Sequence, residues 1–128
     1  MNIGMNKTTM LFIKKTLDYC ALCPGFYGAV LSSPDGLVIA SSGALVGDEP
    51  AACASSLIFD SNTSLSYVST DKTKEMIIWS DEKLWNVRQL DTDFILLIAS
   101  KDLNSHEAIR MVMKKAATML DQALRFIG

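Results

Sequence analysis

The sequence of residues 28–42, Gly-Ala-Val-Leu-Ser-Ser-Pro-Asp-Gly-Leu-Val-Ile-Ala-Ser-Ser, decides how the chain folds. It predicts two short β-strands joined by a Ser-Pro-Asp-Gly turn. Pro34 presets φ at the first central turn position, Asp35 can bond its own backbone, and Gly36 accepts a positive φ. The stretch leads into residues 47–50 (Gly-Asp-Glu-Pro) and then a segment of small residues. None of these residues is a catalytic group, so we expect function on a surface rather than in a pocket.

The bulk composition is that of one compact domain. The chain has 128 residues, of which 49% are hydrophobic and 20% charged, with a formal net charge of −2. This length is near the commonest domain size and can bury a substantial core. Because no run of Lys or Arg exceeds two residues, the chain offers no surface that would follow a phosphate backbone, and nucleic-acid binding is not expected.

The apolar runs are too short for a membrane span or a signal peptide. The run at residues 10–13 is cut off by Lys14 and Lys15, well short of a signal-peptide core. All other apolar runs fall far below the ~18 residues that indicate a membrane helix. We therefore expect no membrane insertion and a cytoplasmic protein.

Hydrophobic periodicity divides the chain into eight elements. Thr8 or Thr9 is the expected N-cap of the first helix, and Asp48 that of the second, with Pro50 tolerated in its first turn. The final helix shows the clearest apolar face, at residues 109, 113, 116, 120 and 124. The expected elements are a helix over 8–22, strands over 27–32 and 37–42, a helix over 49–67, strands over 75–80, 84–90 and 94–99, and a helix over 105–126.

Two of these elements predict self-association. Residues 94–99 are apolar on both faces, as in a central strand. Residues 76–79 are nearly as apolar but precede a hairpin turn, which is typical of a sheet edge. Because an exposed apolar edge strand invites pairing, we expect it to pair with a second copy of the chain. The small residues 51–56 would allow two copies of the second helix to pack closely; the alternative is that this helix packs only on its own sheet.

The candidates for chemistry are few. Cys20 and Cys23 form a CxxC, which can mark a redox pair or half of a zinc site. The motif falls at a predicted helix end, where the dipole disfavours a thiolate, so buried structural cysteines are the preferred interpretation. His106, the single histidine, is expected to be a polar residue near a helix start, and Asp91 and Asp93 to be solvated turn residues. No phosphate-binding glycine loop is present, and we expect no catalytic residue, cofactor or metal.

Taken in order, these elements resemble the roadblock family of dynein light chains and bacterial GTPase regulators. The resemblance is carried by residues 28–41, then Asp48-Glu49 and the Ala-rich helix, the hairpin through residues 83–88, the apolar strand 94–99 and Leu103-Asn104 before the last helix. It covers residues 8–128 as a single domain and leaves 1–7 as an N-terminal extension, expected to be poorly ordered. Pro50 and the CxxC depart from the family pattern.

The resemblance implies an α/β (α+β) fold, a profilin-like sandwich of order α-β-β-α-β-β-β-α with a five-stranded, mainly antiparallel sheet and helices on both faces. It also implies a homodimer in which the third strands pair and the second helices pack together. The dimer interface expected on this basis comprises Ala51, Ala54, Ser55, Ile58, Asn62, Met76, Ile77, Ile78 and Trp79. The expected partner surface comprises Phe59, Thr63, Trp85 and Arg88.

Two functions follow from the resemblance. One is a homodimeric platform that binds a small Ras-like GTPase and modulates its GTP hydrolysis or localisation. The alternative is a non-catalytic structural adaptor within a larger assembly of the motor or signalling type. In neither case is the chain expected to be an enzyme by itself.

Overall fold

The computed structural model describes residues 5–125 and confirms the expected order of elements. Its boundaries lie within a few residues of those that the sequence predicts. The elements are α1 (Lys7–Cys20), β1 (Phe26–Ser32), β2 (Val38–Gly43), α2 (Asp48–Leu65), β3 (Glu75–Trp79), β4 (Leu84–Gln89), β5 (Ile95–Ser100) and α3 (His106–Leu124).

The five strands form one antiparallel sheet in the order β2-β1-β5-β4-β3. β5 lies at the centre, and all six of its residues are buried. Leu96 and Ile98 pack into one core cluster, whereas Ile95 and Leu97 pack into the other. This alternation is why the strand is apolar on both faces. β2 and β3 are the two edges, so the predictions of a central strand at 94–99 and an edge strand at 76–79 are both confirmed.

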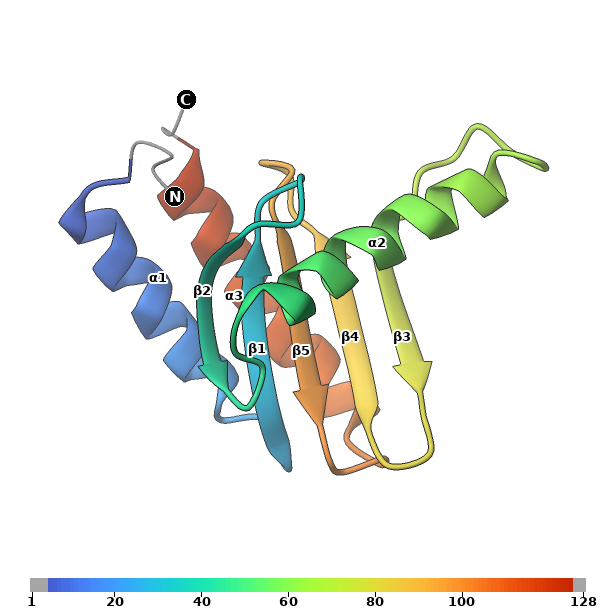
Figure 1. Cartoon of the computed structure of the whole chain (residues 1–128). Coiled ribbons are helices and arrows are strands. Elements are labelled where there is room, and N and C mark those ends of the chain that lie inside the picture. Colours follow the sequence, from blue (N-terminus) through green and yellow to red (C-terminus); the bar gives the residue numbers. More distant parts are fainter. Residues whose placement is uncertain (1–4, 126–128) are drawn as a thin grey trace.

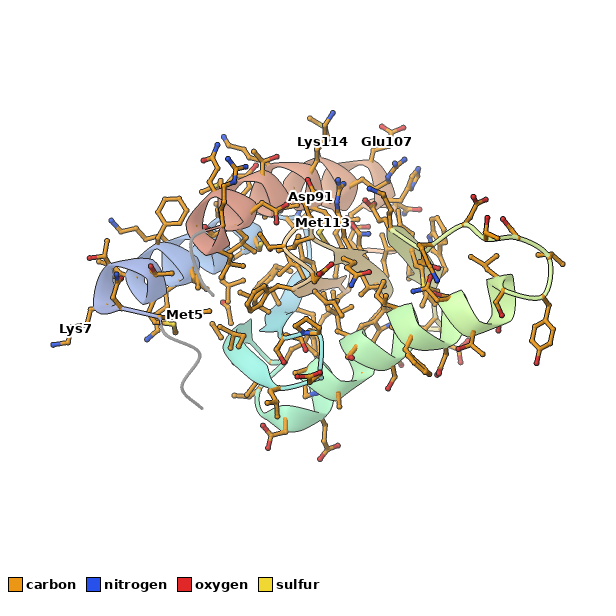
Figure 2. The ribbon with its side chains drawn as sticks, turned by 90° about the horizontal axis from the view of Figure 1, so that it is seen from above. Met5, Lys7, Asp91, Glu107, Met113 and Lys114 are labelled. Carbon is orange, nitrogen blue, oxygen red and sulfur yellow. The ribbon has the colours of Figure 1, made fainter. Side chains whose placement is uncertain are left out.

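Helices cover both faces of the sheet. α1 and α3 pack side by side on one face, and α2 crosses the other face alone (Figure 1). Figure 2 shows the same three layers from above, with Glu107 and Lys114 on the outer side of α3 and the buried Met113 on its inner side. The sandwich is therefore asymmetric, with two helices over one face and one over the other.

The hairpin of residues 28–42 anchors the start of α2. Its turn is closed by Gly36 N–H donating to the Ser33 carbonyl at 3.0 Å and by Ser33 N–H donating to the Leu37 carbonyl at 2.8 Å. Gly36 has a φ of +86°, as the turn requires. The Ser55 hydroxyl donates to the Pro34 carbonyl at 2.9 Å, so the turn is tied directly to α2.

Two expected helix caps are wrong. Asn6, not Thr8 or Thr9, caps α1: its Oδ1 accepts from Thr9 N–H at 2.8 Å. At α2 the N-cap position is Gly47, with a φ of +92° and no side-chain cap bond, so Asp48 lies inside the helix. Its charge still suits the first turn, where the helix dipole favours an anion. The part of the expected N-terminal extension at residues 1–4, and the expected end of the last helix at 126, lie outside the described residues.

The cap assignment is tested by Asn6→Ala. This change removes a side-chain bond to an otherwise unsatisfied N–H, and it should lower the free energy of unfolding by about 1 kcal/mol in urea titrations. The control is Thr8→Ala, at an exposed position without a cap bond. If Thr8→Ala were the more destabilising of the two, the assignment to Asn6 would be wrong.

Candidate partner-binding surface

The inner side of α2 is occupied by the chain's own core. Ala51, Ala54 and Ile58 are buried against β1, β4 and β5, in a cluster that includes Val30 and Leu97. The small residues therefore let α2 lie close to its own sheet. The dimer contact expected at Ala51, Ala54 and Ile58 stays a prediction.

The outer side of α2 is the accessible one, and toward the C-terminal end it exposes large apolar residues among polar ones such as Asp60 and Ser64. Phe59 is 69% exposed, and in the segment that follows the helix Tyr67 and Val68 are 86% and 83% exposed. Thr63 is also exposed on this helix. Exposed large apolar side chains are candidates for contact with a partner when they gather on one part of a surface. We call Phe59, Thr63, Tyr67 and Val68 the α2 outer surface.

Hydrogen bonds join the end of α2 to the start of β3. Asn62 Oδ1 accepts from Thr73 N–H at 2.6 Å, and the Ser61 hydroxyl donates to Thr73 Oγ1 at 2.7 Å. Asn62, expected in the dimer interface, is thus engaged within the chain. These bonds hold the segment that returns from α2 to β3, and the C-terminal end of the helix lies next to the start of that edge strand (Figure 1).

β3 itself is a free apolar edge. Within residues 5–125 it pairs with β4 only, which leaves its other side open to a further strand. Met76 packs into the cluster on the α2 face, and Ile77 into the cluster on the α1/α3 face. Ile78 lies opposite Trp85 in the ladder, and both are partly exposed. The expected residues Met76, Ile77 and Ile78 therefore lie together on one accessible edge.

The two tryptophans are divided between the faces of the sheet. Trp85 joins the α2-side cluster, and its indole N–H donates to Ser80 Oγ at 3.0 Å. Trp79 is 55% exposed; its indole donates to the Leu103 carbonyl at 3.1 Å, and its ring lies 5.8 Å from that of His106, between centroids. The two indole rings therefore lie on opposite faces of the sheet.

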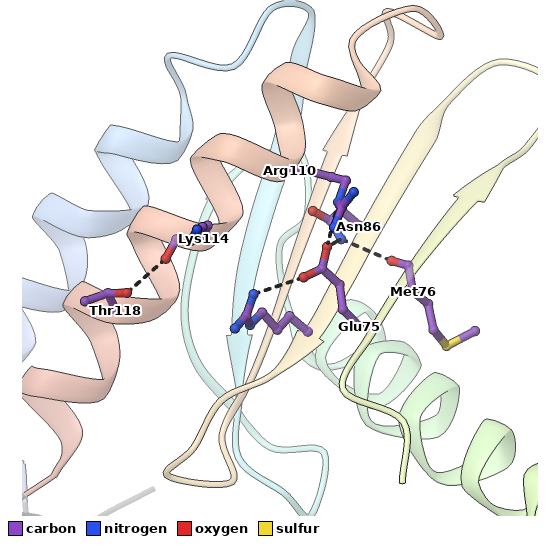
Figure 3. A network of polar contacts seen from close by, with 7 residues as sticks. Glu75, Met76, Asn86, Arg110, Lys114 and Thr118 are labelled. Atoms are coloured by element: carbon purple, nitrogen blue, oxygen red, sulfur yellow. Dashed lines mark hydrogen bonds and ion pairs between the residues drawn. The ribbon is translucent and has the colours of Figure 1, made fainter. Parts of the chain in front are cut away.

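Arg88 lies away from the other expected partner residues. Its Nη1 forms an ion pair with Glu75 Oε1 at 3.1 Å. The other carboxylate oxygen of Glu75, Oε2, forms an ion pair with Nε of Arg110 on α3 at 3.5 Å. Figure 3 shows this network between the sheet and α3. The expected partner surface is therefore split, with Phe59, Thr63 and Trp85 on the α2 side and Arg88 on the α3 side.

Residues 5–125 contain no group of three His, Cys, Asp or Glu side chains that could hold a metal ion. Among the same residues no helix combines the length and the apolar character that a membrane span needs. Cys20 and Cys23 are buried free thiols. Burial, reinforced by the neighbouring Cys23, raises the pKa of Cys20 to about 12, and burial also raises the pKa of Cys23. A thiol with a raised pKa is a poor nucleophile and metal ligand at neutral pH.

Comparison with known proteins identifies the fold. No family model and no curated protein matches the sequence. Among solved structures, the gliding protein MglB from Thermus thermophilus aligns with a TM-score of 0.82 at 13% identity over 95% of both chains. Myxococcus xanthus MglB aligns with a TM-score of 0.81 at 13% identity, over 94% of this chain and 93% of that one. A roadblock/LC7 domain from Streptomyces avermitilis aligns with a TM-score of 0.75 at 18% identity, over 90% and 96%.

These alignments show that the chain has the roadblock/LC7 fold, a profilin-like α+β sandwich. The fold implied by the sequence resemblance is thereby confirmed. At identities of 13–18% the alignments establish the architecture alone.

The burial of Cys20 and Cys23 predicts which of the three thiols reacts with a thiol reagent. At pH 8 only Cys53, which is exposed on α2, should react with a thiol reagent such as dithiobis-nitrobenzoate. Cys20, with a pKa of about 12, holds on the order of one thiolate in ten thousand at that pH. Cys53→Ser should abolish the rapid phase, and denaturant should release the other two thiols. A rapid phase that persists in Cys53→Ser would show that the CxxC is reactive.

Proposed function

We propose that this chain forms a homodimer through β3 and acts as a platform that binds a small Ras-like GTPase and modulates its GTP hydrolysis or localisation. The observation that carries the proposal is the free apolar edge of β3 beside the exposed α2 outer surface. One side chain that the sequence placed at the seam, Trp79, stands exposed at the end of this edge.

The edge strand supports the dimer on physical grounds. Edge strands of soluble proteins are usually protected by charges, prolines or bulges. β3 has one charged residue, Glu75, at its start, followed by Met76, Ile77, Ile78 and Trp79, and no bulge interrupts its pairing with β4. A second β3 would satisfy the unpaired backbone groups and cover the partly exposed Met76 and Ile78. One of the aligned structures is described as MglB with a tetrameric arrangement, at a TM-score of 0.83 and 15% identity, so a chain of this fold is known to self-associate.

The GTPase is the partner that the roadblock resemblance implies. If the platform accelerates hydrolysis, it has to do so by ordering the catalytic loops of the GTPase, because no arginine of this chain lies on α2 or β3. Arg88 and Arg110 lie on the opposite face of the sheet, where both contact Glu75. Such ordering replaces the charge stabilisation that an inserted arginine supplies in other systems. The exposed phenyl ring of Phe59 is the expected anchor, since large aromatic residues dominate binding energy at many interfaces.

The dimer is tested by Ile78→Lys, which places a charge on the β3 edge. The wild-type chain should elute as a dimer in light-scattering chromatography at micromolar concentration, and Ile78→Lys as a folded monomer with an unchanged circular dichroism spectrum. The matched control is Ser41→Lys on β2, the other edge strand, which should remain dimeric. A monomeric wild type, or loss of the dimer in both variants, would contradict pairing through β3.

The platform function is tested with the Ras-like small GTPases of the organism that encodes this chain, purified and assayed one by one. Binding and single-turnover GTP hydrolysis are measured with and without the chain. Phe59→Ala should weaken binding about tenfold or more, as truncation of an aromatic anchor does, and leave the fold intact because Phe59 is largely exposed. Phe12→Ala, a partly exposed phenylalanine on α1, should bind like the wild type.

Each outcome of this assay has a definite meaning. Binding with an altered hydrolysis rate supports the regulatory platform. Binding with an unaltered rate supports a role in localisation only, and no binding to any of these GTPases leaves the structural adaptor as the function.

A further inference from the structure

A surface pocket lies on the α3 face of the sheet, away from the α2 outer surface. It has a volume of about 500 Å³ and lies between the β3–β4 edge and the first half of α3. Besides His106, the residues that line it are Glu75, Arg88, Glu107, Arg110, Met111 and Lys114. None of the surfaces assigned above uses this pocket, apart from Arg88 at one side.

Positive charge is in excess around the pocket. Glu75 is shared by Arg88 at 3.1 Å and by Arg110 at 3.5 Å, so one carboxylate serves two guanidinium groups. Within residues 5–125, Lys114 has no carboxylate at ion-pair distance, and Glu107 is the only other acidic residue of the lining. Three permanent cations thus face two carboxylates, in a chain whose net charge is −2.

The buried side-chain amide of Asn86 holds the carboxylate of Glu75 in place. Asn86 is fully buried, and its Nδ2 donates to Glu75 Oε2 at 3.2 Å and to the Met76 carbonyl at 3.1 Å. Its Oδ1 has no hydrogen-bond partner among the described residues, an arrangement that costs stability. The amide therefore fixes the carboxylate of Glu75 against the sheet (Figure 3).

Arg110 and Lys114 are the exposed cations of the group. The Arg110 side chain is 65% exposed, and its contact with Glu75 is long at 3.5 Å. Lys114 follows one turn later on α3 and is exposed, and Met111, which is 74% exposed, lies between them in the sequence. Long exposed cations of this kind can take up a new carboxylate without breaking a buried pair.

We propose that this pocket binds an acidic side chain of a protein partner, with Arg110 and Lys114 contacting the carboxylate and Met111 covering the adjacent apolar part of the partner segment. The surface is separate from the α2 outer surface, so the chain would hold two partners on opposite faces of one sheet. Strand pairing at β3 uses backbone groups in the plane of the sheet, whereas Glu75 projects from its face. Backbone pairing at β3 and carboxylate binding in the pocket thus use different groups of the chain.

The test uses a blocked tripeptide, acetyl-Leu-Glu-Leu-amide, titrated to millimolar concentration into the ¹⁵N-labelled full chain. We expect shift changes at the amides of Met111 and Lys114, and binding that is about two- to fivefold weaker for the isosteric acetyl-Leu-Gln-Leu-amide, as for loss of one exposed ion pair. Lys114→Gln should weaken binding of the Glu peptide by a similar factor. The matched control is Lys15→Gln, at an exposed lysine of α1, which should bind like the wild type.

A second variant moves affinity in the opposite direction. Glu75→Gln keeps an acceptor for the Asn86 amide but frees both arginines from their carboxylate, so the Glu peptide should bind more tightly to it than to the wild type. A purely structural role for Glu75 would lower stability without raising affinity, and thermal melting of the same variant separates the two effects.

Several results would overturn the proposal. They are the absence of shifts at Met111 and Lys114, equal binding of the Glu and Gln peptides, and unchanged binding in Lys114→Gln. Binding of the matching phosphoserine peptide more than about tenfold more tightly than the Glu peptide would assign the pocket to a phosphate group instead. Because peptide binding is measured on one chain, its failure leaves the dimer and GTPase experiments unaffected.

Discussion

The architecture depends on the burial of β5 from both sides. All six residues of this strand are buried, and its side chains alternate between the two core clusters. A strand that is apolar on both faces needs helices on both, which α1 and α3 supply on one side and α2 on the other. Since β1 and β4 occupy the two edges of β5, β2 and β3 are left as the outer strands. The accessible edge of β3 is therefore a consequence of how the core is covered.

The two faces of the sheet are chemically different near that edge. On the α2 side the exposed large apolar residues are Phe59, Tyr67 and Val68, which lie among exposed polar residues of the same segment. On the α3 side they are charged, because α3 places Arg110 and Lys114 next to the Glu75–Arg88 pair. A sheet of this kind can present an apolar and a cationic surface to different partners at the same time. The asymmetry follows from the two different helix layers that cover the sheet.

The departures from the sequence predictions have specific physical causes. A row of small residues on α2 allows close packing, but it does not determine whether the helix packs on its own sheet or on a second chain. Ala51, Ala54 and Ile58 pack on their own sheet because the α2 face of β5 needs cover first. Asn6 and Gly47 take the cap positions because helix ends depend on backbone geometry that hydrophobic periodicity does not encode. Arg88 faces the α3 side because side chains alternate along β4, and it pairs there with Glu75 across the β3–β4 ladder.

The amino-acid sequence by itself determined the order of the elements, the central place of residues 94–99 and the edge character of residues 76–79. Each of these follows from local periodicity or turn chemistry. Only the tertiary structure decided that Trp85 and Trp79 lie on opposite sides of the sheet and that the alanines of α2 face the core. It also decided that one pocket is lined by Glu75, Arg88 and Arg110, which come from three different elements. The reason is that side chains distant in the sequence meet only after strand order and helix placement are set. The surface chemistry of this chain is therefore a property of its fold.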